Sequence, residues 1–430
     1  MIKARARWEM LNLIRREKFD IILPKAMREN KINMWIHVMR EGNPDPLALD
    51  LGGRYGYFIF TDRGGDRIER VVLGGSEHML RRSGVYDIFG SEKDLRKFVT
   101  ERDPQRIAVN MSEWVAVADG LSHTCYLKLV EILEEKYAKR LVSAGQLITD
   151  FRTRRVTSEI VAYSKLGETT RQILERALSN EVITPGVTTR EDVAWWVQDQ
   201  LLVRGMGSSF GFSMPSVIHS AESEEAEYRA SRYVIQRGDL LSFDFGITFM
   251  NLGTDLKRVA YMLREGETAV PQGIQNAWNQ GLEAREVIRK NIKVGRAAGE
   301  TLKILGRALE EAGFAYIPAD PTTDGGFSGL KPGEHLKHPE KTEVSIDCHC
   351  VGNTGNSEVA VGPSIAPFRP DRAHLTIKPN NLFAFEFVAY TAVPEWGGRK
   401  MRFNIEDDAI VTENGVEWLY PENDQILLIF

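Results

Sequence analysis

A single acidic residue interrupts a nearly all-apolar segment of the chain. The run LFAFEFVAYTAV, residues 382 to 393, is predicted to form a strand, and Glu386 is its only charged residue. Such a residue must be buried in the core or face a cavity. A buried carboxylate without a partner costs several kcal/mol, and metal coordination is one of the few ways to offset that cost. A fold for this chain therefore has to accommodate a charge inside one of its most apolar strands.

Three further acidic residues lie on or beside predicted strands. The alternation in GDLLSFDFGIT, residues 238 to 248, places Asp244 away from the more apolar face. A hairpin that turns through residues 250 to 253 would bring Asp244 close to Asp255, eleven residues further on. In KMRFNIEDDAIVT, residues 400 to 412, Glu406 falls on a polar face. Facing carboxylates repel unless a cation lies between them, although Asp244 could instead cap a turn and Asp255 could end a strand in solvent.

A histidine stands between two cysteines in SIDCHC, residues 345 to 350. Neighbouring side chains of a strand point to opposite faces, so Cys348 and Cys350 cannot ligate one ion together with His349 without a kink. We therefore expect two half-buried cysteines beside a functional histidine rather than a sulfur-ligated zinc site.

These positions form a set of four carboxylates and one imidazole: Asp244, Asp255, His349, Glu386 and Glu406. Four negative charges match two divalent cations. The oxygen-rich set suits Mn²⁺, with Zn²⁺, Co²⁺ or Fe²⁺ as alternatives. Two such ions can hold a bridging hydroxide and polarise a carbonyl oxygen, which is the apparatus for amide hydrolysis.

Composition excludes several classes of protein. With 55 Lys and Arg against 60 Asp and Glu, the net charge is −5, so nucleic acid is an unexpected partner. Three cysteines suit a reducing compartment. The opening MIKARARWEMLNLIRREKFD is charged throughout and does not resemble a signal peptide, and no run approaches the roughly 18 apolar residues of a membrane span. We expect a cytoplasmic protein without a membrane partner.

The length of 430 residues allows two or three domains, and the pattern changes near Arg152. Residues 1–151 alternate short strands with helices, and residues 152–430 contain two similar helix–turn–helix units. One unit runs from a glycine turn at Gly186 to a helix-ending Gly205, and the other runs from Gly295 to Gly313. In the first unit, Thr188 and Glu191 have the spacing of a capping box. The sequence thus predicts an α/β (α+β) protein whose second domain consists of two related halves.

The order of these motifs resembles the pita-bread metallopeptidase superfamily, which includes methionine aminopeptidase, aminopeptidase P, prolidase and creatinase. The resemblance is carried by GDLLSFDFG with TDLKR, HCVG, FAFEF and PEWGGRKMRFNIEDDAIVTENG, and it covers about residues 152 to 420. It implies a pita-bread catalytic domain that acts on a peptide or a small amide. Residues 1–151 resemble the smaller creatinase-type N-terminal domain of the Xaa-Pro aminopeptidase-like branch, which implies a homodimer.

The resemblance also implies a role for each residue of the set. Asp244 would bind one metal ion bidentately, Asp255 and Glu406 would bridge both ions, and His349 and Glu386 would complete the shell of the other ion. Glu386 would in addition be the catalytic proton shuttle for the bridging water, because burial raises the pKa of a carboxyl toward neutral pH.

The chain departs from the family pattern around the substrate. Asn356 stands where the family has a second, substrate-contacting histidine, and an amide can donate a hydrogen bond to an oxyanion but cannot carry a proton. Glu227 replaces a histidine upstream of the first aspartate, and His219 is the nearest candidate to line the site. Asn404 replaces an arginine, for which Arg399 or Arg402 could substitute.

Three functions are consistent with these residues. The first is a dinuclear metal hydrolase of the Xaa-Pro aminopeptidase type that uses a metal-bridging hydroxide. The second is a creatinase-like enzyme that cleaves a non-peptide C–N bond, and the third is a catalytically inactive binding protein that keeps the fold. Retention of all five metal-binding residues favours the first.

Overall fold

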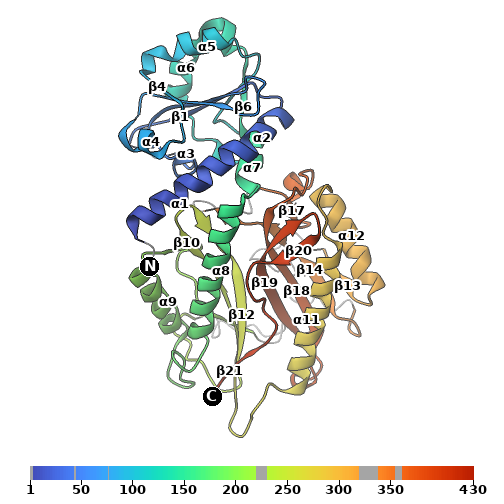
Figure 1. The fold of residues 1–430 in the computed structure, drawn as a ribbon. Coiled ribbons are helices and arrows are strands. Elements are labelled where there is room, and N and C mark those ends of the chain that lie inside the picture. Colours follow the sequence, from blue (N-terminus) through green and yellow to red (C-terminus); the bar gives the residue numbers. More distant parts are fainter. Residues whose placement is uncertain (1–2, 43–44, 76, 219–229, 319–337, 354–360) are drawn as a thin grey trace. The chain divides into compact units, whose positions relative to one another are not determined.

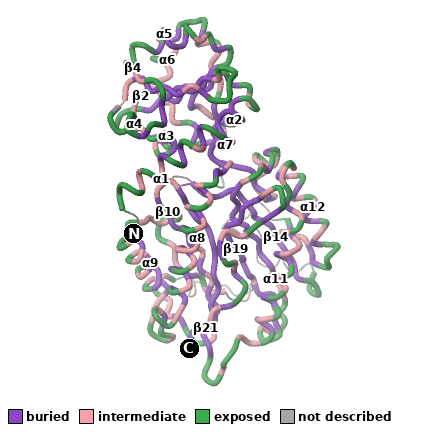
Figure 2. Tube along the Cα trace, in the orientation of Figure 1, coloured by how far each residue is buried: buried purple, intermediate pink, exposed green. Residues whose placement is uncertain are grey.

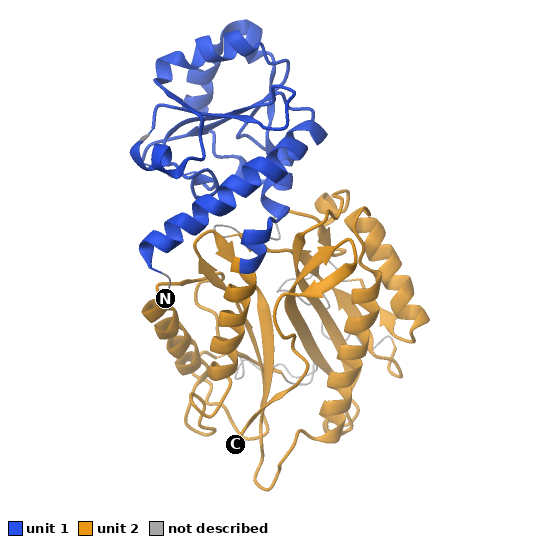
Figure 3. Ribbon diagram, viewed as in Figure 1, with its two compact units in different colours: residues 1–161, 355–361 blue, residues 162–354, 362–430 orange. Residues whose placement is uncertain are grey.

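The computed structural model describes residues 3–42, 45–75, 77–218, 230–318, 338–353 and 361–430. They divide into two compact units, one made mainly of Met1–Val161 and the other of Ala162–Thr354 and Gly362–Phe430 (Figure 3). Helix α8, Thr157–Ala177, begins in the first unit and continues in the second. The boundary predicted near Arg152 falls at the end of helix α7, Gly145–Thr153, shortly before this division.

The first unit is built on a mixed six-stranded sheet with the order β4-β3-β2-β1-β5-β6. Its strands are β1 Met34–Met39, β2 Gly56–Thr61, β3 Glu69–Leu73, β4 Ile88–Gly90, β5 Ile107–Val109 and β6 Leu141–Ser143. Its other helices are α1 Ala4–Glu17, α2 Leu23–Glu29, α3 Ala48–Leu51, α4 Glu77–Ser83, α5 Leu95–Arg102 and α6 His123–Ala138. Apolar side chains of α5 and α6, among them Phe98 and Leu129, pack on Ile36 and Ile107 of the sheet, and these give the unit a core of its own.

The described strands of the second unit form three sheets, and several of these strands are labelled in Figure 1. Two four-stranded sheets have the orders β16-β11-β10-β7 and β21-β12-β9-β8. The third sheet has the order β13-β14-β18-β15-β17, with β19 paired to β18 and β20 paired to β19. The strands are β7 Gly207–Ser208, β8 Ser216–Ile218, β9 Leu240–Phe245, β10 Ile247–Phe249, β11 Leu252–Gly253, β12 Leu256–Met262, β13 Ala315–Tyr316, β14 Glu343–Ile346, β15 Cys348–Cys350, β16 Gly352–Asn353, β17 Ser364–Ile365, β18 Asn381–Ala392, β19 Lys400–Thr412, β20 Gly415–Trp418 and β21 Leu427–Ile429.

Helices cover the largest sheet and bury its apolar face. Helix α11, Gln272–Asn291, packs on β18 and β19, and α12, Ala298–Glu311, lies beside α11 and β17. Trp278 of α11 meets Phe403 of β19 edge to face, with ring centroids 5.2 Å apart. The tube in Figure 2 is purple along β19 because almost all of this strand is buried. The acidic residues of β18 and β19 therefore lie in the interior of the unit.

The two predicted halves show corresponding contacts at their glycine turns. The Gly186 amide donates to the carbonyl of Ile235 at 2.7 Å, and the Gly295 amide donates to the carbonyl of Ile377 at 2.8 Å. Both glycines have positive φ, +82° and +84°, which a residue with a Cβ rarely adopts. In each half the following strand carries an acid nine residues after that carbonyl, Asp244 in β9 and Glu386 in β18.

The capping box of the first half begins one residue later than the sequence suggested. Thr189 is the N-cap of helix α9, Arg190–Arg204, and it exchanges hydrogen bonds with Asp192. Its hydroxyl accepts from the Asp192 amide at 3.1 Å, and its own amide donates to the Asp192 carboxylate at 2.9 Å. The prediction of Thr188 and Glu191 is therefore wrong by one position, because both pairs have the spacing of the motif.

No helix among the described residues is both long and apolar enough to cross a membrane.

Candidate metal centre

Strand register brings the predicted residues to one place in the second unit. Strands β18 and β19 pair antiparallel with Glu386 directly opposite Glu406. His349 of β15 faces Ala384 of β18, two positions from Glu386. Asp255 lies just before β12, and its amide donates to the Asp408 carboxylate of β19 at 3.2 Å, which ties the start of β12 to the largest sheet. The predicted hairpin between Asp244 and Asp255 is confirmed, since β9 pairs antiparallel with β12.

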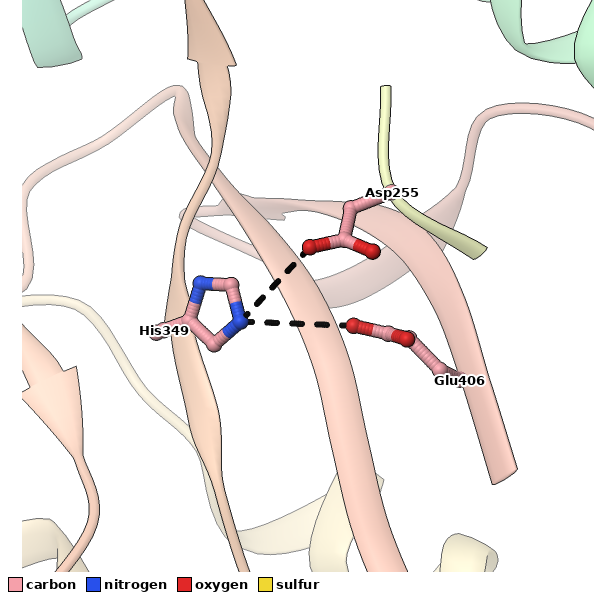
Figure 4. Close-up of side chains that lie close together, drawn as sticks. All are labelled: Asp255, His349 and Glu406. Atoms are coloured by element: carbon pink, nitrogen blue, oxygen red, sulfur yellow. Dashed lines mark ion pairs between the residues drawn. The ribbon is translucent and has the colours of Figure 1, made fainter. Parts of the chain in front are cut away.

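His349 directs its Nε2 atom at Asp255 and Glu406 (Figure 4). Its Nε2 lies 3.8 Å from Asp255 Oδ2, 3.7 Å from Glu386 Oε2 and 4.0 Å from Glu406 Oε1. The Nδ1 atom lies 3.1 Å from the Cys350 carbonyl oxygen. A proton on Nδ1 would be donated there, which leaves the Nε2 lone pair directed at the carboxylates, as a metal ligand requires.

The donor set fits a divalent ion. One atom from each of Asp255, His349 and Glu406 lies within 4.8 Å of the others, and all three residues are buried. Each of the four predicted acids has one buried carboxylate oxygen without a hydrogen-bond partner among the described residues: Asp244 Oδ1, Asp255 Oδ1, Glu386 Oε2 and Glu406 Oε1. Unsatisfied buried carboxylate oxygens are costly, and a cation that accepts their lone pairs removes that cost. These residues can therefore hold a divalent ion beside His349.

A lysine that the sequence reasoning did not single out also enters the cluster. Lys257 of β12 faces Asp244 across the β9–β12 ladder. Its Nζ lies 3.0 Å from Asp244 Oδ2 and 2.8 Å from Glu386 Oε1, and it contacts Glu406 Oε2 as well. The sequence held a signal for this position, because Lys257 stands two residues after Asp255 on one strand and so shares its face.

Two further partners hold the acids in place. Asn404 of β19 donates from Nδ2 to Glu386 Oε1 at 2.8 Å. Asp347, between β14 and β15, forms a second group of potential ligands with His349 and Glu386. The guanidinium of Arg369 contacts both oxygens of Asp347. Asn404 was expected only as a departure from the family pattern, whereas its amide in fact orients the buried carboxylate.

Burial and mutual repulsion perturb the acids in different directions. Burial raises the pKa of Asp255 and of Glu406 well above the usual range, and the charge of a neighbouring carboxylate raises both further. Burial also acts against ionisation of Glu386, but Lys257 and then His349 outweigh it and lower the pKa of Glu386. Burial opposes the charge on Lys257, yet Asp244, Glu386 and Glu406 together raise the pKa of Lys257 well above its usual value. The lysine is therefore an ammonium ion in this centre.

The outcome for the predicted residues is mixed. The expected rise in the pKa of Glu386 is wrong, because the sequence reasoning counted burial and left out the ammonium group 2.8 Å away. Cys348 and Cys350 are free thiols on the strand that carries His349, but they are fully buried in the hydrophobic core rather than half-buried as predicted, because the largest sheet is covered by helices. His219, Glu227 and Asn356 lie outside the described residues.

Comparisons with known proteins agree with this geometry. The model of metallopeptidase family M24 matches residues 162–413. The X-Pro aminopeptidase of Thermotoga maritima MSB8 is 17% identical with a TM-score of 0.64, and the match covers 94% of this chain and 99% of that one. No curated protein matches by sequence.

Two further solved structures are similar over nearly their whole length. The Xaa-Pro dipeptidase of Bacillus anthracis is 19% identical with a TM-score of 0.60, with 97% and 99% of the two chains covered. The prolidase of Pyrococcus furiosus is 20% identical with a TM-score of 0.55, with 92% and 98% covered. These likenesses confirm the predicted pita-bread fold. The chain belongs to metallopeptidase family M24, a family of hydrolytic peptidases that depend on divalent metal ions.

Proposed function

We propose that this chain is an Xaa-Pro aminopeptidase-like enzyme, which removes the residue that precedes proline at the N-terminus of a peptide. The observation that carries the proposal is the cluster of His349 with Asp255 and Glu406, in which Asp255 Oδ1 and Glu406 Oε1 are buried without a hydrogen-bond partner among the described residues. The fold supports the choice of substrate, since the three solved structures named above are an X-Pro aminopeptidase, an Xaa-Pro dipeptidase and a prolidase.

The residues of the centre divide the work of amide hydrolysis. A divalent ion beside His349, for which Mn²⁺ suits the oxygen-rich donors, would polarise the scissile carbonyl and make water a stronger acid. In this proposal Glu386 carries the proton: it is ionised at neutral pH and can accept one, although its lowered pKa makes it a weaker base than a glutamate in water. Its Oε1 is fixed by Lys257 and Asn404, and its Oε2 faces His349. Glu386 can accept a proton at Oε2 and return it to the leaving amine.

The exposure of the acids indicates from which side a substrate would reach them. The side chain of Asp244 is 36% exposed, whereas those of Glu386 and Glu406 are 1% and 0% exposed. A peptide would therefore approach past Asp244, and the deeper carboxylates would stay shielded from water. The proposal includes the expected homodimer and cytoplasmic location.

Hydrolysis of defined peptides by the purified full-length chain tests the proposal. The panel contains an Xaa-Pro dipeptide, a longer peptide that begins Xaa-Pro, the same peptides with alanine in place of proline, and creatine. We expect Mn²⁺-dependent release of the first residue from the proline peptides, and we expect it to stop when the ion is chelated. Cleavage of creatine alone would replace the proposal with the creatinase-like alternative.

A pair of matched variants ties the activity to this centre. Asp255→Asn removes one charge of the cluster with little change in shape and is expected to lower turnover at least a hundredfold, as loss of a group essential to the centre does. Asp424→Asn makes the same change at an exposed position of the second unit and should leave turnover unchanged. Activity of Asp255→Asn at the wild-type level would show that the catalytic centre lies elsewhere.

A further inference from the structure

The side chain of Lys257 reaches both acidic strand pairs of the centre. It belongs to β12 and is paired with Asp244 of β9, while Glu386 and Glu406 form a facing pair on β18 and β19. Its side chain is 5% exposed, so the ammonium group is held among carboxylates rather than in solvent. The contacts of this ammonium group with three carboxylates place a positive charge in the interior of the unit.

The contacts of Lys257 divide the carboxylate oxygens into two sets. Lys257 Nζ engages Asp244 Oδ2, Glu386 Oε1 and Glu406 Oε2. The opposite oxygens of the same two glutamates, Glu386 Oε2 and Glu406 Oε1, lie at 3.7 and 4.0 Å from His349 Nε2 and accept no hydrogen bond from the described residues. One side of the acidic cluster thus contacts the lysine, and the side that faces His349 is left for an ion.

The contacts of Lys257 with these oxygens conflict with the binding of a second divalent ion. The family resemblance implies that Asp244 binds the second ion bidentately and that Glu406 bridges to it. Both residues give an oxygen to Lys257 instead, and only Oδ1 of Asp244 lacks a hydrogen-bond partner. A divalent ion on these same oxygens would also meet the repulsion of the ammonium group at short range. The residues present fit one ion and do not fit two while Lys257 keeps its contacts.

We propose that Lys257 is a built-in cation that replaces the second divalent ion, so that this chain binds a single divalent ion beside His349. Asp255, His349 and Glu406 would hold the ion, with Glu386 at its edge, and Lys257 contributes one further positive charge, which Asp244, Glu386 and Glu406 share. The inference rests on the proposed function only for the choice of a divalent ion as cofactor.

Counting bound Mn²⁺ tests this directly. The full-length chain is stripped of metal, dialysed to equilibrium against MnCl₂, and analysed for Mn and protein. We expect one Mn²⁺ per chain in the wild type, with the electron paramagnetic resonance spectrum of an isolated ion. Lys257→Met removes the charge and keeps most of the volume, and it should double the count to two ions and give the spectrum of a coupled pair.

Two control variants separate the effect of this lysine from a general change of charge. Lys303→Met removes an exposed lysine of α12 and should still bind one ion. Lys257→Arg keeps the charge in the centre and should also bind one. Circular dichroism establishes that each variant is folded. If Lys257→Met does not fold, the wild-type count and the Lys257→Arg count still decide the question.

The possible results discriminate clearly. Two ions, or none, in the wild type would overturn the inference, and so would a folded Lys257→Met variant that still binds one. Failure of the peptide assay is a separate outcome, because a chain that binds one ion and cleaves none of the peptides refutes the proposed activity and leaves the role of Lys257 supported.

Discussion

At the scale of single residues, the pKa of each acid of the centre reflects the balance between burial and the charged groups that it contacts. Glu386 meets Lys257 at 2.8 Å and becomes a stronger acid than a glutamate in water. Asp347 meets Arg369, but burial and the charge of Glu386 outweigh that contact and raise the pKa of Asp347 to about 6. The pKa values of two buried carboxyls in one cluster are thus shifted in opposite directions.

The raised pKa of Asp347 predicts a pH dependence of stability. The folded chain holds this proton more tightly than the unfolded chain does, so the contribution of Asp347 falls as pH rises from about 4 through about 6 and is constant above. Across that range the metal-free wild type should lose about 3 kcal/mol of unfolding free energy relative to Asp347→Asn, since one pKa unit is about 1.4 kcal/mol.

Urea unfolding of both proteins at several pH values, with the metal chelated, measures this difference. Asp371→Asn, at an exposed aspartate beside Arg372, serves as the control and should follow the wild type at every pH. A difference between wild type and Asp347→Asn that does not change with pH would show that Asp347 has an ordinary pKa.

At the scale of strands and helices, the sequence predicted which side chains share a face, and it did not predict which strands meet. Alternation placed Cys348 and Cys350 opposite His349, because the period of a strand is two regardless of its neighbours. It could not show that Glu386 lies directly opposite Glu406, since that depends on the register of the β18–β19 hairpin. Lys257 was missed because only acids, histidine and cysteines were considered as members of the centre.

The bend between β9 and β10 depends on a glycine. A Cβ built on Gly246 would overlap the carbonyl oxygen of Thr254, a backbone atom that cannot rotate away. Gly246→Ala should therefore push β9 from its place beside the start of β12, and Asp244 would move with it. We expect a loss of about 3 kcal/mol or more in unfolding free energy together with weaker Mn²⁺ binding.

Chemical denaturation and Mn²⁺ titration of Gly246→Ala measure both effects. Gly266→Ala is a useful comparison because a Cβ there has open space, so that only its positive φ of +84° opposes the substitution. Gly266→Ala should lose stability without a change in Mn²⁺ binding. Wild-type stability in Gly246→Ala would mean that the two strands are not in close contact at this bend.

At the scale of the whole molecule, all the described residues of the centre belong to the second unit, while the first unit has a separate core. The fold class and the family were predictable from the order and spacing of the acidic motifs in this chain, although its overall identity to the solved structures named above is only 17–20%. The residues around the substrate could not be predicted in the same way, because they depend on segments outside the described part of the chain.

This separation predicts where metal binding stabilises the chain. An ion that binds only the folded state at a concentration a hundred times its Kd adds about 2.7 kcal/mol to the free energy of unfolding. Hydrogen exchange with and without Mn²⁺ should show increased protection in β12, β15, β18 and β19 of the second unit and none in β1 to β6 of the first. Equal protection of both sets of strands would contradict this assignment, and Asp255→Asn should show no increase in either.

The direct pairing of Glu386 with Glu406 has a consequence for how the protein matures. Like charges that face each other across a ladder oppose its closure, so a centre made of acids alone would need its metal before β18 and β19 could zip together. Lys257 arrives with the polypeptide itself and places one positive charge beside both glutamates as soon as β12 docks. A newly synthesised chain can thus complete its structure in a cell short of metal, and loading of the ion becomes a late step that follows folding.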